Sequence, residues 1–181
     1  MSTDPVPAGT LYTVAYPVLP PEEAQLIEHV RTAHDRLHDV IRAHFTLVFG
    51  CDAVPLDAYL AHVEAVTATA REIEFRCGRA TLGAVSDGLA PVFLVPDEGY
   101  SDLALLHDAL YTGPLAPHLC RERPYVPHLT VGTLASQRGA QALCDSLNDR
   151  GVRVSGVVNA LHVGSIRGER FQHHAVYRTR A

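Results

Sequence analysis

The sequence predicts an α+β fold with two lobes of similar topology, related by a pseudo-twofold axis. Strand and helix signals alternate as strand-helix-strand-helix-strand, and this order occurs twice before one last strand. A pattern of His, an apolar residue and Thr also occurs twice, at the second strand of each run. We therefore expect one two-lobed domain over residues 1–181, its lobes approximately the interleaved halves 1–86 and 87–181. Antiparallel sheets would face each other across a central cleft, with helices outside.

The first half contains five segments with clear signals. Aromatic and β-branched residues bounded by prolines predict a strand over 11–16. Two prolines and two glutamates then open a helix that we expect to run to about residue 39. A strand follows over 41–49, and apolar residues near helical spacing predict a helix over 56–70. Residues 72–85 indicate a strand with a bend at one of its glycines.

The second half repeats this order after a turn at Ser86-Asp87-Gly88. Ser101 is the expected N-cap of its first helix. The segments that we expect are a strand over 91–95, a helix over 102–110, a Pro- and Arg-containing loop over 114–124, a strand over 125–132, a helix over 136–150, and strands over 151–166 and 171–179.

Composition indicates a globular protein of the cytoplasm. The chain is 47% apolar but has no run of roughly 18 apolar residues, so no transmembrane helix is expected. The first five residues show no secretory signal. Four scattered cysteines make neither a C-x-x-C pair nor a compact disulfide framework, which favours a reducing compartment.

The charged residues limit the classes of ligand. The net charge of −5 argues against binding to long duplex nucleic acid, which needs many cationic contacts, but leaves a small anionic ligand open. All 15 basic residues are Arg, so P-loop, Schiff-base and other catalytic lysines are excluded. We expect no cofactor, no metal, no membrane partner and a monomeric protein.

The repeated pattern places an imidazole beside a hydroxyl. In a regular strand His44, Thr46 and Val48 share one face, while Phe45, Leu47 and Phe49 share the other. The second copy puts His128 and Thr130 on one face and Leu129 and Val131 on the other. Each strand would thus anchor itself in a core and present half of a polar site.

Two facing histidines suit concerted proton transfer. One neutral imidazole can take a proton from an attacking water or hydroxyl, and the other, protonated, can give one to the leaving oxygen. The threonine hydroxyls can donate hydrogen bonds to non-bridging oxygens of a phosphate held between the two imidazoles. This chemistry needs no metal.

The two motifs resemble those of a known enzyme superfamily. His-Phe-Thr-Leu-Val-Phe-Gly and Pro-Tyr-Val-Pro-His-Leu-Thr-Val-Gly are similar to the paired His-x-Ser/Thr motifs of the two-histidine phosphoesterases, which include the LigT-like 2′-5′ RNA ligases. The resemblance implies a bilobal α+β fold and metal-free processing of 2′,3′-cyclic phosphates or 2′-5′ linkages on a small nucleotide or an RNA end. It implies catalytic roles for His44 and His128 and phosphate binding by Thr46 and Thr130.

Other residues near the motifs have two interpretations each. Arg42 could hold a phosphate or pair with a surface carboxylate. Arg121, Arg123 and Tyr125 precede the second motif in a loop that could carry ligand contacts. Tyr125 could stack on a base or pack against the other lobe.

Histidines outside the motifs are weaker candidates. His34 and His38 have metal-ligand spacing but no evident third ligand, and the charged residues around them predict a solvated polar face. His173 and His174 should face opposite ways, with Phe171, Ala175 and Tyr177 beside His173, which makes His173 at most a residue at the rim of the site.

Two other functions compete with an enzyme. A noncatalytic module that binds nucleotides or RNA ends would keep the same site but show no turnover. A scaffold protein with accidental motifs would hold His44 and His128 far apart.

Overall fold

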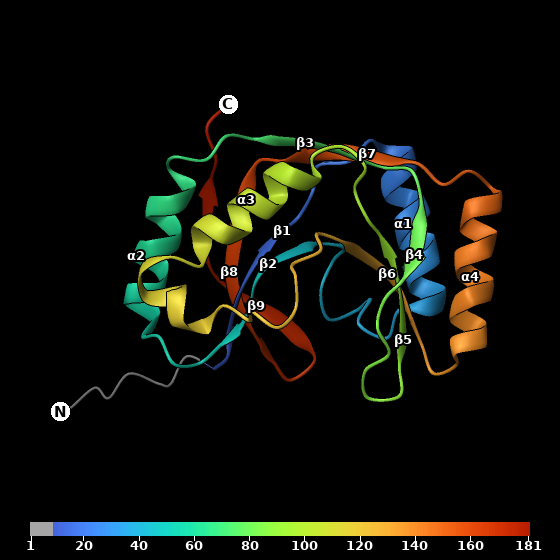
Figure 1. Ribbon diagram of the computed structural model, residues 1–181, viewed down its shortest axis with the longest axis horizontal. Helices are drawn as coiled ribbons and strands as arrows, with labels where there is room; N and C mark the ends of the chain where they lie inside the picture. The colour runs from blue at the N-terminus through green and yellow to red at the C-terminus, as the bar shows by residue number, and fades with distance from the viewer. Residues whose placement is uncertain (1–8) are drawn as a thin grey trace.

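The computed structural model describes residues 9–181 and has the predicted α+β architecture, with every strand pairing antiparallel. Figure 1 shows two groups of helices and strands side by side, joined along one edge by the strands β3 and β7. The first five residues, where the sequence shows no secretory signal, lie outside the described residues.

The first lobe contains a four-stranded sheet in the order β2-β1-β8-β9. Helices α2 (Leu56–Thr67) and α3 (Tyr100–Leu110) pack against it, α2 on β8 and β9 and α3 on β2. The strands are β1 (Leu11–Ala15), β2 (Phe45–Cys51), β8 (Ala160–Arg167) and β9 (Arg170–Arg178). Each end of the chain contributes two of these strands.

The second lobe contains a three-stranded sheet in the order β4-β5-β6. Helix α1 (Pro21–His34) packs on β6, and α4 (Gln137–Asp149) contacts all three strands. The strands are β4 (Ala80–Leu82), β5 (Ala90–Leu94) and β6 (Leu129–Leu134). A division near residue 86 therefore does not separate the two sheets, because each draws strands from both sides of it.

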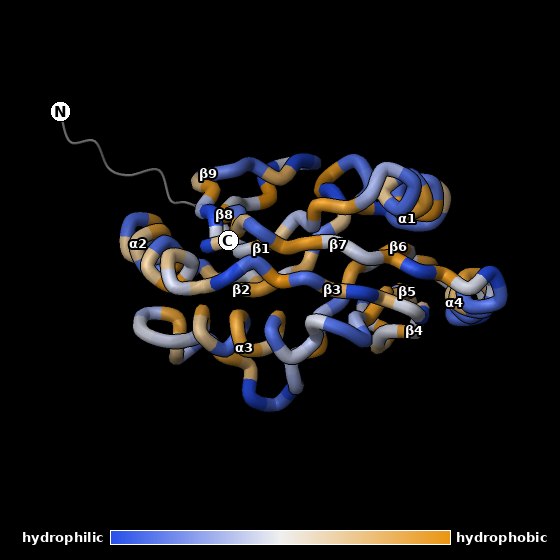
Figure 2. The backbone as a smooth tube through the Cα atoms, turned by 90° about the horizontal axis from the view of Figure 1, so that it is seen from above, coloured by the Kyte–Doolittle hydropathy of each residue, from blue (hydrophilic) through white to orange (hydrophobic). Residues whose placement is uncertain are grey.

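The strands β3 (Ile73–Cys77) and β7 (Val154–Val158) form a separate two-stranded ribbon. In β3, buried and exposed residues alternate strictly, as expected for a strand with one apolar face. Figure 2 shows this ribbon running between the two lobes. Its inner face contributes Phe75, whose ring meets that of Phe45 edge to face at 5.0 Å between centroids.

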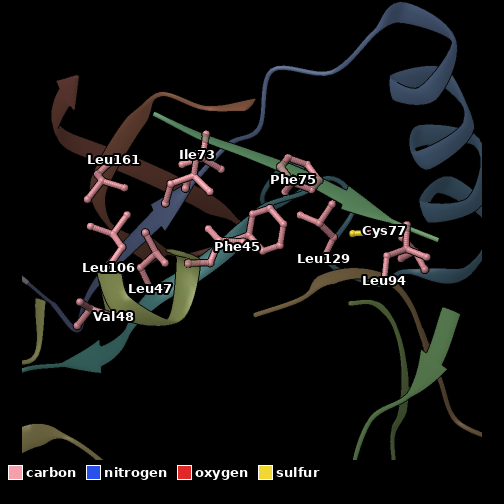
Figure 3. Close-up of a cluster of buried hydrophobic side chains, with 14 of the residues drawn as sticks. Phe45, Leu47, Val48, Ile73, Phe75, Cys77, Leu94, Leu106, Leu129 and Leu161 are labelled. Carbon is pink, nitrogen blue, oxygen red and sulfur yellow. The ribbon is translucent and has the colours of Figure 1, made fainter. Parts of the chain in front are cut away.

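One main core connects all of these sheets. Leu47 of β2 and Leu129 of β6 are both completely buried in it, and Phe75 of β3 is nearly so. Figure 3 shows these side chains gathered beneath the ribbon. The apolar residues inside the two His-x-Thr motifs, Phe45 and Leu129, thus anchor both motifs to the same core, as predicted.

Several predicted boundaries are wrong. The first helix ends at His34 rather than near residue 39, and the strand after it begins at Phe45 rather than at residue 41. The third helix begins at Tyr100 after Gly99, whose φ of 77° is easily adopted by glycine, so Ser101 lies inside the helix and does not cap it. Segments 72–85 and 151–166 each divide into two strands that belong to different sheets.

The strand predicted over 125–132 begins only at Leu129 and ends at Leu134, and the other predicted elements agree closely with the structure. Helix α4 begins at Gln137, one residue after the predicted start, and Ser136 caps it by accepting a hydrogen bond from the Gly139 amide at 3.1 Å. The loop before β6 contains one short 3₁₀ helix (Gly113–His118). All four cysteines are free thiols. None of the helices in residues 9–181 is long and apolar enough to cross a membrane.

Candidate active site

His44 lies immediately before β2, and its ring is held by the backbone of its own segment. Its Nδ1 is 2.7 Å from the carbonyl oxygen of Arg42. A carbonyl can only accept, so Nδ1 carries the proton and the neutral ring keeps an unprotonated Nε2. No described residue bonds to that Nε2, which leaves it available for a proton.

His128 repeats this arrangement immediately before β6. Its Nδ1 is 2.6 Å from the carbonyl oxygen of Val126, again the residue two positions earlier. The same reasoning assigns the proton to Nδ1 and leaves Nε2 available. Both histidines are half-buried, and neither ring has a side-chain hydrogen-bond partner in residues 9–181. His44 and His128 therefore have the same tautomer, fixed in each case by a hydrogen bond to the carbonyl two residues earlier.

Both motifs also contain a β-bulge one residue after the threonine. In β2 the residues Thr46 and Val48 pair with successive residues of β1, so Leu47 is extra. In β6 the residues Thr130 and Gly132 pair with successive residues of β5, so Val131 is extra. A bulge bends the strand and redirects the side chains beyond it. The pseudo-symmetry of the two motifs therefore extends to their backbone irregularity.

The bulge in β2 overturns part of the predicted alternation. Val48, expected on the face of His44, is completely buried. Phe49, expected in the core, is 47% exposed. Thr46 and Thr130 precede the bulges, are half-buried, and have hydroxyls without a hydrogen-bond partner in the described part of the chain.

Each histidine has an aromatic neighbour in, or directly after, the adjacent strand. The ring of Phe93 in β5 stacks on His128 at 3.9 Å between centroids. The ring of Tyr16, directly after β1, meets His44 edge to face at 6.2 Å. The two contacts differ in position as well as geometry, because Phe93 pairs with Thr130 whereas the residue of β1 that pairs with Thr46 is Val14.

Tyr125 links the two motifs. Its hydroxyl donates to the carbonyl oxygen of Thr46 at 2.9 Å, and it stands three positions before His128. Its ring stacks on His107 at 3.8 Å with planes 2° apart, and His107 in turn bonds to the Leu47 carbonyl at 2.8 Å. Of the two interpretations of Tyr125, the structure shows packing against the other lobe.

Burial lowers the pKa of both histidines. Desolvation is the main cause for His44, whose pKa falls to about 4, and the Arg31 and His128 charges lower it further while the Arg42 carbonyl opposes the shift. Desolvation also lowers the pKa of His128, against the opposing effect of the Val126 carbonyl. The charge of His128 is one of the smaller causes of the lowered pKa of His44, after burial, the Arg42 carbonyl and Arg31.

A buried ion pair supports the segment that leads to His44. Arg31 and Asp35 are 1% and 7% exposed, with Nη2 and Oδ2 2.8 Å apart. Arg31 also donates to the carbonyl of Ile41 at 2.7 Å, and the hydroxyl of Thr133 donates to Asp35 at 3.2 Å. The prediction of a solvated face around His34 is therefore wrong for Arg31 and Asp35, because both side chains are buried. Their contacts fix the segment of chain between α1 and β2.

The other candidates are placed in different surroundings. The guanidinium carbon of Arg42 lies 4.2 Å from the centre of the Tyr16 ring, beside His44. Arg121 and Arg123 are exposed in the loop before β6, with no ion pair within residues 9–181. His38 bonds to Glu28 at 3.0 Å, and no metal-binding group of three or more His, Cys, Asp or Glu occurs in that same range.

A further bulge, in β9, changes the environment of His173. Ala175 and His173 pair with the successive residues Val163 and Gly164 of β8, so His174 is extra. His173 therefore does not share a face with Ala175 as predicted. It faces Tyr16, at 5.8 Å between ring centres, while His174 bonds to Ser165 on the opposite side.

Comparison with known proteins identifies the family. The model of the 2′-5′ RNA ligase superfamily matches residues 18–170. Escherichia coli LigT in complex with 3′-AMP is similar in structure, with a TM-score of 0.60, 16% identity, and 94% of this chain and 98% of that chain covered. TT0787 of Thermus thermophilus matches with a TM-score of 0.63, 14% identity, and coverages of 95% and 98%.

Usb1 of Kluyveromyces marxianus is also similar, with a TM-score of 0.53, 10% identity, and 93% of this chain and 99% of that chain covered. No curated protein matches the sequence significantly. At these identities the solved structures show a shared fold. Since the family model covers most of the chain, including both His-x-Thr motifs, the protein belongs to the 2′-5′ RNA ligase superfamily.

Proposed function

We propose that the protein is a metal-independent phosphoesterase that acts on nucleotide phosphodiesters, either 2′,3′-cyclic phosphates or 2′-5′ linkages. The observation that carries this proposal is the matched state of His44 and His128, each with Nδ1 bound to the carbonyl two residues earlier and Nε2 available. Two identical imidazoles with accessible Nε2 atoms suit an acid and a base on opposite sides of a phosphate.

The reaction on a cyclic phosphate needs one proton at each end. The Nε2 of one histidine takes a proton from water as the water oxygen bonds to phosphorus. The bond from phosphorus to the 2′ or 3′ oxygen breaks, and the Nε2–H of the other histidine gives that oxygen a proton. Thr46 and Thr130 donate hydrogen bonds to the non-bridging oxygens, where negative charge must be stabilised. The pseudo-symmetry allows either histidine to be the base, and the orientation of the substrate decides.

Substrate binding supplies the protonated histidine. Burial keeps the pKa of both rings below the ordinary value, so both are mostly neutral at pH 7 in the free protein. An opposite charge within about 4–6 Å favours the protonated form. A bound phosphodiester would raise the pKa of the nearer ring and prepare it as the acid.

The ligands of relatives support a nucleotide substrate. The LigT structures include complexes with 3′-AMP, NADP+ and ATP, so that protein accommodates nucleoside phosphates. The net charge of −5 favours a short substrate over a long nucleic acid here.

A turnover screen tests the proposal. The purified protein is incubated with the four nucleoside 2′,3′-cyclic phosphates and with 2′-5′-linked dinucleotides, with and without EDTA, and products are separated by chromatography. We expect hydrolysis of at least one class at a rate that EDTA leaves unchanged. Loss of activity with EDTA would contradict the metal-free mechanism. Binding of these compounds without turnover would instead favour a noncatalytic nucleotide-binding module.

A further inference from the structure

A cluster of rings and a guanidinium lies next to His44 and has no role in the chemistry above. Tyr16 is its centre, with His162 at 4.7 Å and His173 at 5.8 Å between ring centroids. The two histidines are 5.3 Å apart, and Arg42 lies over the Tyr16 ring. Tyr16 therefore lies between His44 and the two histidines of the cluster.

Arg42 is held in place by stacking rather than by an ion pair. Its guanidinium carbon is 4.2 Å from the Tyr16 ring centre, and no carboxylate within residues 9–181 is within ion-pair distance. A guanidinium stacked on a ring keeps its N–H groups in its own plane, where they remain free to donate. Arg42 is also exposed, so a ligand can reach these donors.

The groups that act on His162 and His173 are all basic. Burial lowers the pKa of His162 to about 4, and His173, Arg42 and Arg178 lower it further. Burial, Arg42 and His174 likewise lower the pKa of His173. No carboxylate among residues 9–181 contributes to either shift, so the cluster has no negative partner in the described chain.

The ring of His162 can offer one N–H group to a ligand. Its other ring nitrogen, Nδ1, is buried and has no hydrogen-bond partner in residues 9–181. A buried lone pair costs less than a buried unpaired N–H, so the neutral ring carries its proton on Nε2. That atom is not buried and has no partner in the described chain, so it can donate to a ligand.

We propose that Arg42, His162 and His173 bind a second phosphate group of the substrate, beyond the one held between His44 and His128. Donors without carboxylate partners, one of them a stacked guanidinium, suit an anion with several oxygens. The substrate class is then a nucleotide with at least two phosphates, such as an RNA end or a phosphorylated cyclic nucleotide. This inference rests on the proposed function, because it takes the first phosphate to lie at the two motifs.

Equilibrium binding of product-like compounds tests the second phosphate without requiring turnover. The dissociation constants of adenosine 2′-phosphate, adenosine 2′,5′-bisphosphate and the dinucleotide ApAp are measured by calorimetry. The bisphosphate offers a terminal second phosphate and ApAp an internal one. We expect at least one of them to bind roughly tenfold or more tightly than the monophosphate, since hydrogen bonds to charged groups are the stronger kind.

Matched variants identify the site. Arg42→Gln and His162→Gln should each reduce the preference for the second phosphate severalfold or more. If the variant at the half-buried His162 does not fold, His173→Gln, at an exposed position, takes its place in the test. Arg138→Gln and His29→Gln, exposed on other elements, should keep the full preference. Imidazole NMR signals of His162 and His173 should shift with the bisphosphate and not with the monophosphate.

Two results separate this inference from the proposed function. Equal affinities for all three compounds, or a preference that survives Arg42→Gln and both histidine variants, would overturn the second phosphate site even if the protein hydrolyses cyclic phosphates. A preference lost in these variants, in a protein without any turnover, would support the site and contradict the proposed enzyme.

Discussion

The hydroxyl of Tyr125 donates a 2.9 Å hydrogen bond to the carbonyl oxygen of Thr46, across 79 residues of sequence. One end of this bond lies inside the first His-x-Thr motif, and the other lies three positions before His128. The bond therefore connects the two halves of the candidate active site directly. A reaction that needs an acid and a base on opposite sides of one phosphate depends on such a connection, because displacements of about 1 Å can cost 10²-fold in rate.

Tyr125→Phe should lower activity more than stability. The variant keeps the stack on His107 but loses the bond to Thr46, which is worth about 1 kcal/mol. We expect the free energy of unfolding, measured with denaturant, to fall by about that amount, and kcat to fall several-fold. Tyr12→Phe is the control, since the Tyr12 hydroxyl has no hydrogen bond in residues 9–181. Equal kcat in the two variants would contradict the positioning role.

Asp35→Asn should destabilise the protein strongly. It leaves the charge of Arg31 buried without its partner, and breaking a buried pair in this way costs about 3–5 kcal/mol. Thermal unfolding should show a large decrease in Tm. Asp39→Asn is the matched control, because the Asp39 side chain is 98% exposed and its pairing with His38 contributes little. A Tm for Asp35→Asn within a degree of the control would rule out a supporting role for the pair.

The pH dependence follows from the lowered histidine pKa values. In the free protein the pKa of His44 is about 4 and that of His128 is below its ordinary 6.5, so the state with one protonated ring prevails only below about pH 6.5. We expect kcat/KM to peak on the acid side of neutrality and to fall as the pH rises. Because a bound phosphate raises these pKa values, the optimum of kcat should lie at higher pH than that of kcat/KM. Initial rates between pH 4.5 and 9 give the pH profiles of kcat/KM and kcat. If the two profiles were identical and stayed flat up to pH 9, the role of a protonated histidine as the acid would be contradicted.

Local sequence patterns predicted the motifs well. Side-chain alternation correctly placed Phe45 and Leu129 in the core, because alternation over a few successive residues follows from the geometry of the strand itself. The alternating order of strands and helices likewise predicted the α+β fold.

Features that depend on a partner strand were not predictable in this way. The bulges at Leu47 and Val131 arise from pairing with β1 and β5, and only that pairing places Val48 in the core. The bulge at His174 similarly turned His173 toward Tyr16.

Buried polar groups were the other source of error. Arg31 and Asp35 looked solvated because charged residues usually are. Their burial depends on Ile41 and Thr133, which approach them only in the folded chain.

The most direct test of the central claim is the turnover of a 2′,3′-cyclic nucleotide by His44→Ala and His128→Ala, with the exposed His118→Ala as control. Each motif variant should lose roughly 10²–10⁴-fold in kcat while its circular dichroism spectrum stays that of the parent, because each removes one proton-transfer group. His118→Ala should keep the parent rate. Full activity in a folded His44→Ala or His128→Ala variant would contradict the two-histidine mechanism.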